Sequence, residues 1–421
     1  MKNNVEAFDL FQYLLQFSYE PLIRCRIDFA GHIDFDILTQ AVTRSMDSVP
    51  LLRCCFDDSR LRPRWVERDF TGEDIVHLVN AEKNKSIDEQ ITFYYSSNID
   101  FISEPQLKIY VVRKTEGDTL CIIINHMICD GAGFKQYLYL LSELYTKLKN
   151  NKTLPVTVLH PRGLDLLISH LTLKEKWKIL STEPENEGLI NTHRQIGMGI
   201  GSDGKKPYME ARVITKERFE KLRVYGKTRG ATLNDLLMTL FSRSFCKNTQ
   251  TEKIAFPSTM DLRRFIPADK HHGISNFSTN CMCLISVKAD DPFIVTLKQV
   301  SEQMQNYKSS NIPLRGIIWW YYCARLIPFW YLKRNKDILK PPIVSFTNLG
   351  ILDSSLLCFD DLFINSAYLS TAFKRSPFFQ LIVSTYRDRI ILGCSYYGDN
   401  DNKRWIDGIF DDIFSEMESL E

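Results

Sequence analysis

Residues 121–131 read CIIINHMICDG and contain the most informative motif of the chain. Its apolar first part is typical of a buried strand, and that strand ends abruptly at His126, which is followed by Asp130 and Gly131. Because an imidazole has an ordinary pKa of about 6.5, it is suited to take a proton from a hydroxyl or an amine at neutral pH. His126 is therefore a candidate general base. The spacing fits equally well a core histidine that is hydrogen-bonded to a turn aspartate.

The segments around this stretch predict a mixed α/β first half. Residues 23–29 alternate between apolar and polar, as in a strand that buries one face. Apolar residues recur at three- and four-residue spacing over 35–49 and again from Gly133 to Leu148, which predicts two amphipathic helices. Further strands are predicted over 107–112 and 120–124.

The periodicity is lost between Lys149 and about Pro207, where Asn, Lys, Glu, Pro and Gly become frequent, as in a long connection with short helices. Regular patterns then return, and the two halves look alike in outline. Strands are predicted over 208–214, 254–256, 281–287, 343–346, 379–385 and 390–396, and helices over 216–225, 232–245, 293–307 and 403–417. We therefore expect a first lobe over 1–155, a linker with short helices over 156–207 and a second lobe over 208–421.

The composition is that of a globular protein with a sizeable core. Of the 421 residues, 44% are hydrophobic and 25% are charged, which is close to globular averages. Lysine and arginine total 53 against 51 for aspartate and glutamate, so the net charge of +2 supplies no global field to hold nucleic acid or an anionic membrane. We expect neither of them as a partner.

Targeting and metal signals are weak as well. The first residues lack the basic-then-apolar order of a secretion signal, so we expect a cytoplasmic protein. The longest apolar stretch, 316–332, contains Arg325 and Pro328 and is too short to form a transmembrane segment; it suits a core helix or the wall of an apolar pocket. The 11 cysteines include no CxxC pair, so we expect reduced thiols and no metal site.

Glycines at 199, 201 and 204 satisfy the GxGxxG pattern of nucleotide-binding loops. Such a loop needs a buried strand before it and a helix after it. Here polar residues precede the pattern, and Pro207 with a strand-like run follows. We therefore expect a flexible connection rather than a nucleotide site.

The motif His126-x-x-x-Asp130-Gly131, between an apolar strand and a helix, resembles the signature of the chloramphenicol-acetyltransferase-like superfamily. This superfamily includes nonribosomal-peptide condensation domains, plant acyltransferases and alcohol acyltransferases. Other segments resemble it in the same order along nearly the whole chain: GHID at 31–34, PLLR at 50–53, EPQL at 104–107, GATLND at 230–235, MDLRR at 260–264 and GISNF at 273–277.

The resemblance implies an α/β fold of two similar lobes, each a mixed sheet with packed helices, with an active-site tunnel between them and His126 midway along it. It implies no bound cofactor. The co-substrate is an acyl thioester on coenzyme A or on the phosphopantetheine arm of a carrier protein, and the acceptor is a small alcohol or amine. His126 accepts the proton of the acceptor as it attacks the thioester carbonyl, and no covalent acyl-enzyme forms. A monomer is expected.

The resemblance also assigns structural roles at the site. Asp130 points away from substrate and pairs with an arginine, for which Arg263 is the first choice and Arg264 the second. Gly131 belongs to the same structural group. A surface charge in a basic dipeptide explains Arg263 equally well.

Three further residues are candidates for substrate binding. Asn125 stands where condensation domains usually carry a first histidine. Thr347 and Asn348 lie in a stretch that resembles the Ser-Asn-Leu-Gly segment of alcohol-acyltransferase-like members, and either side chain suits a hydrogen bond to the developing oxyanion. A turn at a strand end, closing at Gly350, explains this stretch more simply.

We therefore predict an acyltransferase and favour an ester product, because Asn125 replaces the first histidine and no carrier or adenylation segment is attached. The first alternative is a free-standing condensation enzyme of the nonribosomal-peptide type, which forms an amide. The second is a non-catalytic, condensation-like scaffold that docks a carrier protein.

Overall fold

The computed structural model describes residues 3–420 except 60, 83, 155–157, 183–205, 289, 337, 338, 340 and 341. The glycine pattern at 199–204 and part of the predicted linker 156–207 lie outside the described residues.

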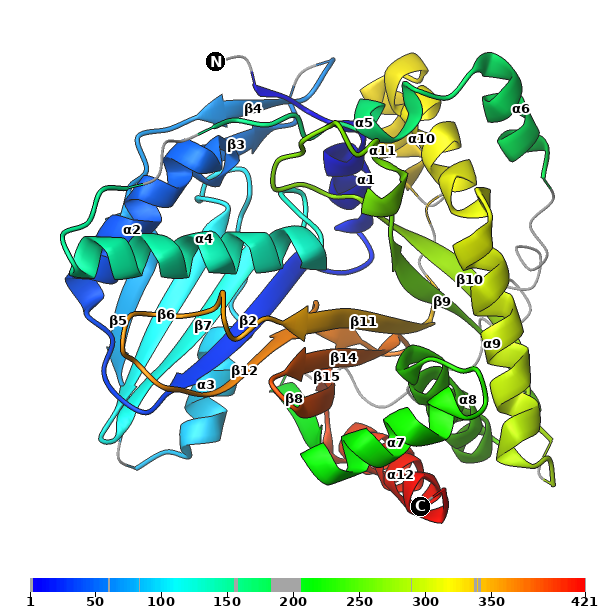
Figure 1. The fold of residues 1–421 in the computed structure, drawn as a ribbon. Coiled ribbons are helices and arrows are strands. Elements are labelled where there is room, and N and C mark those ends of the chain that lie inside the picture. The colour runs from blue at the N-terminus through cyan, green and yellow to red at the C-terminus, as the bar shows by residue number, and fades with distance from the viewer. Residues whose placement is uncertain are drawn as a thin grey trace.

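The first lobe is built on a mixed sheet whose strands lie in the order β12-β2-β7-β6-β5 (Figure 1). The bounds are Ile364–Ser370 for β12, Leu22–Phe29 for β2, Gly117–Asn125 for β7, Leu107–Lys114 for β6 and Val76–Asn80 for β5. The central strand β7 is buried along its whole length, which explains why its residues 120–124 are apolar without alternation. Helices α2 (Phe35–Ser48) and α4 (Gly131–Lys149) pack together on one face of the sheet, while α3 (Ile87–Tyr95) contacts β7 separately.

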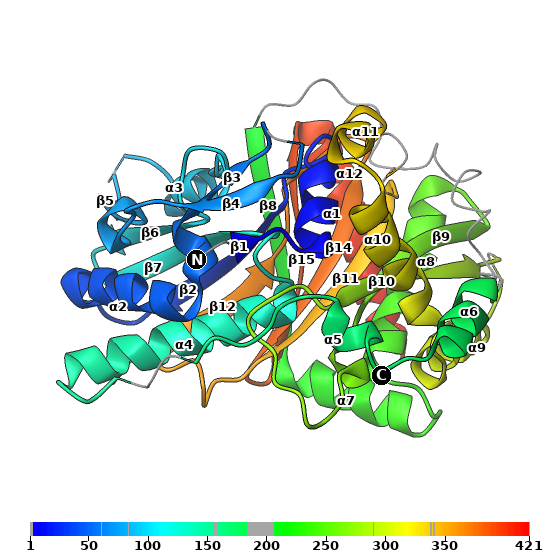
Figure 2. The same cartoon turned by 90° about the horizontal axis from the view of Figure 1, so that it is seen from above.

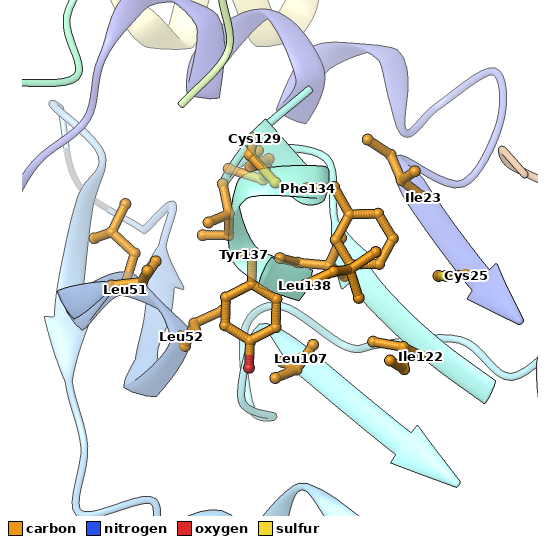
Figure 3. Close-up of a cluster of buried hydrophobic side chains, with 14 of the residues drawn as sticks. Ile23, Cys25, Leu51, Leu52, Leu107, Ile122, Cys129, Phe134, Tyr137 and Leu138 are labelled. Atoms are coloured by element: carbon orange, nitrogen blue, oxygen red, sulfur yellow. The ribbon is translucent and has the colours of Figure 1, made fainter. Parts of the chain in front are cut away.

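The start of α4 packs into the core of this lobe. Figure 3 shows Phe134, Tyr137 and Leu138 of α4 among side chains of β2, β6 and β7. The Tyr137 hydroxyl is hydrogen-bonded to the buried Ser45 hydroxyl of α2 over 3.1 Å, so its polar group is satisfied inside the core. The helix that follows the motif is thereby held against the strand that precedes it.

The second lobe contains a mixed sheet in the order β10-β9-β11-β14-β15-β13, with β8 on the other edge of β15. The bounds are Ser278–Ser286 for β10, Lys253–Asp261 for β9, Val344–Leu352 for β11, Phe379–Tyr386 for β14, Arg389–Gly398 for β15, Lys374–Arg375 for β13 and Lys206–Ile214 for β8. Its core contains helices α7 (Lys216–Lys227), α8 (Leu233–Thr249), α9 (Phe293–Ser309) and α12 (Asn400–Ser419). The predicted fold class, α/β with a mixed sheet and packed helices in each of two lobes, is confirmed.

Smaller elements complete the fold. A small sheet has the order β1-β4-β3, with β1 at Asn3–Asn4, β4 at Arg64–Glu67 and β3 at Cys54–Asp57. The remaining α-helices are α1 (Ala7–Leu15), α5 (Asp165–Ile168), α6 (Leu173–Ser181), α10 (Arg315–Leu326) and α11 (Phe329–Arg334). Among the described residues, none of these helices or of those above is long and apolar enough to cross a membrane.

Two segments of the second half cross into the first lobe. Strand β12 pairs antiparallel with β2, with Ala367 opposite Ile27. Helices α10 and α11 lie beside α1 (Figure 2) and add apolar side chains to the core of the first lobe. The Trp320 indole donates a hydrogen bond of 2.6 Å to the carbonyl of Ala7. The sequence-based lobe boundaries, 1–155, 156–207 and 208–421, assign β12, α10 and α11 to the second lobe. The structure shows that these elements pack in the first lobe.

The aromatic stretch 316–332 forms amphipathic helices. Ile318 and Trp320 are buried in the core of the first lobe, whereas Trp319 and Trp330 are about half exposed. The buried side of these helices agrees with the prediction that this stretch forms a core helix.

Candidate active site

His126 lies directly after β7, where the first sheet ends. The last residue of β7, Asn125, pairs with Leu22 of β2, and the His126 amide donates a hydrogen bond of 2.7 Å to the carbonyl of Pro21. The strand end therefore fixes the backbone of His126, and the residue as a whole is not fully buried.

The imidazole of His126 is held by Asn276, a residue of the other half of the chain. The Asn276 amide nitrogen donates to the carbonyl of His126 over 2.8 Å, and its Oδ1 lies 3.1 Å from His126 Nδ1. Because the amide nitrogen is committed to a carbonyl, the oxygen must face the ring, and an oxygen can only accept a hydrogen bond. His126 Nδ1 therefore carries the proton, and Nε2 keeps its lone pair.

Burial lowers the pKa of His126 below its ordinary value of 6.5, and the positive charge of Lys374 acts in the same direction. The charge of Asp130 and the hydrogen bond to Asn276 oppose this shift. The net effect is a lowered pKa, so the ring is neutral at pH 7. A neutral ring with a free Nε2 has the protonation state that a general base needs.

Asp130 forms the predicted pair with Arg263. Its carboxylate accepts hydrogen bonds of 3.0 and 2.9 Å from the two terminal nitrogens of Arg263, and further ones from the amides of Gly133 (2.8 Å) and Phe277 (2.7 Å). Arg264, the second choice, donates instead to carbonyls at the end of α9. Asp130 thus caps α4 and ties the motif to the loop that carries Asn276.

Arg162 is a positioning residue that the sequence interpretation missed. It forms a bidentate ion pair with the buried Asp9, at 2.8 Å for both bonds. It also donates to the carbonyls of Met127 (3.2 Å) and Ile128 (3.3 Å), so it supports the turn that follows His126. Arg162 falls within the predicted linker, where no pattern pointed to it. Asn276 did lie in the GISNF segment that carried the resemblance, and that was its only signal.

Two glycines at the start of α4 allow a close approach of the second half. A Cβ on Gly131 would lie 2.6 Å from a methyl group of Leu349 on β11. A Cβ on Gly133 would lie 2.8 Å from the backbone oxygen of Ser275, next to Asn276. Gly131 was predicted to be structural. A side chain at Gly133 would be tolerated less well than one at Gly131, because a backbone oxygen moves less easily than a flexible side chain.

Asn125 shapes the turn at His126. It is fully buried; its amide nitrogen donates to Gln106 Oε1 over 2.7 Å, and its oxygen accepts from the amide of Met127 over 2.9 Å. Both ends of the amide are therefore bound to protein. The predicted contact of Asn125 with substrate stays a prediction.

Thr347 and Asn348 lie on β11 and are bound to other protein groups. The Thr347 hydroxyl donates to the hydroxyl of Thr259 over 3.1 Å, and the Asn348 amide nitrogen donates to Asn234 Oδ1 over 3.0 Å. The structure does not bring either side chain into hydrogen-bond contact with His126 within the described chain, so the oxyanion role stays a prediction. The turn expected to close at Gly350 is instead an irregularity inside β11, where Gly350 has a φ of +75°.

A hollow of about 440 Å³, including open solvent at its mouth, lies beside the second sheet. Residues of β9, β10, β11 and β14 line it together with Tyr19 from the first half and Lys374 of β13. The predicted tunnel between the lobes stays a prediction. Across the described residues, no group of three or more His, Cys, Asp or Glu side chains is arranged to hold a metal ion.

Comparisons with known proteins agree with this architecture. Residues 12–163 match the family model of the Condensation domain. No curated protein matches the chain in sequence. Polyketide synthase associated protein 5 from Mycobacterium tuberculosis has a similar structure, with a TM-score of 0.70, 13% identity and coverage of 99% of both chains.

Two more solved structures represent different chemistries. The TRI3 trichothecene 15-O-acetyltransferase from Fusarium sporotrichioides has a TM-score of 0.70 at 13% identity, over 98% of this chain and 95% of that one. The first condensation domain of the calcium-dependent antibiotic synthetase, in complex with a substrate analogue, has a TM-score of 0.66 at 11% identity, over 98% and 97%. The chain therefore has the two-lobed fold that it shares with solved condensation-domain and acetyltransferase structures.

Proposed function

We propose that this protein is an acyltransferase that moves an acyl group from a thioester to a small alcohol or amine, with His126 as the general base. The observation that carries the proposal is the bond from His126 Nδ1 to Asn276 Oδ1, because it leaves Nε2 unprotonated on a residue that is not fully buried. The thioester is on coenzyme A or on the pantetheine arm of a carrier protein.

The proposed reaction needs one base and no covalent enzyme intermediate. As the acceptor oxygen or nitrogen attacks the thioester carbonyl carbon, its proton passes to His126 Nε2. The tetrahedral oxyanion then collapses, the carbon–sulfur bond breaks, and the proton passes from His126 to the departing thiolate. General-base action contributes typically about 10²–10⁴-fold, and holding both substrates in place supplies further acceleration.

We favour an alcohol acceptor. The likeness to an O-acetyltransferase supports an ester product, although at 13% identity this likeness concerns the fold. The match of residues 12–163 to the Condensation domain supports the second candidate, an amide-forming enzyme supplied by a separate carrier protein. The donor, the acceptor and the monomeric state all stay predictions.

The test is release of free thiol from a panel of acyl-CoA and acyl-carrier-protein thioesters, each combined with alcohol and amine acceptors. We expect activity in the wild type and a loss of at least about 10²-fold in His126→Ala. His170→Ala, which changes an exposed histidine, is the matched control and should keep full activity.

Two results would count against the proposal. Full activity in His126→Ala would show that another group acts as the base. No thiol release from any donor, together with binding of a carrier protein, would identify the chain as a scaffold.

A further inference from the structure

Lys374 is a buried cation near the candidate reaction centre. Its side chain belongs to the short strand β13, it is only 9% exposed, and its ammonium lies 3.7 Å from the centre of the Tyr19 ring. Within the described part of the chain, this ammonium makes no hydrogen bond or ion pair. Burying a charge without an oxygen partner is costly, and lysine is rarely buried unpaired. The position of Lys374 therefore calls for a ligand.

The carboxylate whose charge acts on Lys374 is bound to other groups. Glu20 lies next to Tyr19, and its carboxylate is 2.8 Å from a terminal nitrogen of the buried Arg24. The same Glu20 oxygen accepts a hydrogen bond of 2.7 Å from the amide of Phe373. The charge of Glu20 also acts on Lys374, but its carboxylate is bound to Arg24 and to the Phe373 amide, so it leaves the Lys374 ammonium without a hydrogen-bonded oxygen in the described part of the chain.

The ring of Tyr19 replaces only part of the hydration that the Lys374 ammonium loses on burial. A cation–π contact is attractive, but an aromatic face accepts no strong hydrogen bond from an ammonium group with three donors. The same arrangement occurs at Lys336, whose ammonium lies 3.8 Å from the centre of the Phe17 ring outside the hollow. Lys336 is therefore a matched control for the cation–π contact alone.

Lys374 lines the hollow of about 440 Å³ described above. The wall is half apolar, and its polar members are Tyr19, Thr259, Asn280, Ser345, Lys374 and Gln380. The Gln380 oxygen accepts from the hydroxyl of Thr371 over 2.7 Å, so its amide nitrogen remains a donor. A concave wall with a cation, further donors and apolar sides is the usual makeup of a small-molecule site.

One short segment of backbone, residues 19–21, contributes both to the wall of the hollow and to the hydrogen bond that holds the His126 amide. Tyr19 lies two residues before Pro21, whose carbonyl accepts the hydrogen bond of the His126 amide. Lys374 is also close enough for its charge to act on the imidazole of His126. A molecule held at Lys374 is thus near the candidate base.

We propose that Lys374 binds a negatively charged oxygen group of a substrate in this hollow, either a carboxylate on the acyl group or acceptor, or a phosphate of the thioester donor. Both sources present the same chemistry, an oxyanion that accepts charge-assisted hydrogen bonds from the ammonium. The proposal rests on the proposed function only for the reaction in which the bound group takes part.

The test is isothermal titration calorimetry on the full chain with named probes. The carboxylate arm uses glutarate and its neutral dimethyl ester, and the phosphate arm uses coenzyme A and pantetheine, which lacks the phosphates. The variants are Lys374→Met, Lys374→Arg and the matched control Lys336→Met.

We expect glutarate or coenzyme A to bind the wild type, and to bind Lys374→Met at least about 10-fold more weakly, because a hydrogen bond to a charged group is lost. Lys374→Arg should retain most of the affinity, and Lys336→Met all of it. Dependence on Lys374 for glutarate identifies a carboxylate, and dependence for coenzyme A alone identifies a phosphate. The ester and pantetheine should be insensitive to the substitution.

The proposal is overturned if neither anion binds the wild type, or if Lys374→Met binds both anions as tightly as the wild type does. Thermal denaturation checks for misfolding: removal of a buried charge that has no hydrogen-bonded partner should leave Tm unchanged or raise it. If Lys374→Met does not fold, Lys374→Gln, which also removes the charge, takes its place in the same comparison.

This experiment needs no turnover, so it separates the two proposals. Anion binding through Lys374 in a protein that releases no thiol would support the site and refute the acyltransferase. Thiol release without Lys374-dependent anion binding would have the opposite meaning.

Discussion

Among single residues, the contact between His126 and Asn276 joins the two halves of the chain. The ring of His126 belongs to the first lobe, and the amide that fixes its protonated nitrogen belongs to Asn276 in the loop after β9. The orientation of Asn276 is in turn set by the carbonyl of His126 itself. The tautomer of His126 and the orientation of the Asn276 amide therefore depend on each other.

The pH dependence of activity follows from these contacts. Because the pKa of His126 lies below its ordinary 6.5, the wild type should keep its base neutral, and its kcat/KM high, down to a pH below 6.5. Asn276→Ala removes a hydrogen bond that raises this pKa, so the acidic limb of the profile should move to lower pH while kcat falls. Profiles of kcat/KM between about pH 5 and 9 measure both effects. An acidic limb at or above pH 6.5 in the wild type would contradict this assignment.

The sequence could predict the residues that carry a local motif. His126 and Asp130 stand four apart after an apolar strand, and Arg263 follows a recognisable Met-Asp-Leu stretch. Asn276, Arg162 and Lys374 act through contacts between segments that are more than a hundred residues apart or in strands of two residues. No spacing within one element records such contacts.

At the scale of elements, the start of α4 is the joint between the lobes. Asp130 caps the helix, and its first turn contacts both the loop 273–277 and β11. The sequence predicted α4 from its apolar spacing. It did not predict β12, whose pairing with β2 joins segments that are far apart in the chain, nor the irregularity in β11 near Gly350.

Gly133→Ala tests this joint. The added methyl group would lie 2.8 Å from the backbone oxygen of Ser275, so the loop that carries Asn276 must shift. We expect a loss of about 1–3 kcal/mol in the free energy of unfolding and reduced thiol release. Denaturant unfolding and the thiol assay measure the two effects.

The matched control is Gly316→Ala in α10, where, apart from the surrounding helix backbone, no atom of the described residues lies within 4 Å of the added Cβ. Alanine is favoured over glycine in a helix by about 0.5–1 kcal/mol, so this variant should be as stable as the wild type or more stable. If the two variants had the same free energy of unfolding, the close contact between Ser275 and α4 would not contribute to stability.

At the scale of the whole molecule, the two lobes are not independent. The first sheet takes its edge strand β12 from the second half, and the core of the first lobe takes apolar side chains from α10 and α11. Expressed alone, residues 1–207 would expose this core and the edge of β2. We expect that fragment to lack a cooperative thermal transition, and co-expression with residues 208–421 to restore one.

Circular dichroism on heating distinguishes these outcomes. A fragment 1–207 that melts cooperatively, at the temperature of the full chain, would show that β12 and the two helices add little to the first lobe.

The late position of β12 also matters during synthesis. Roughly 240 residues separate the end of β7 at Asn125 from the start of β12 at Ile364. At translation rates of about 5–20 residues per second, the open edge of β2 waits about 10–50 s on the ribosome for its partner. An unpaired strand edge is a template for joining other chains. During this interval the nascent protein is exposed to pairing with other chains along this edge, which β12 later covers.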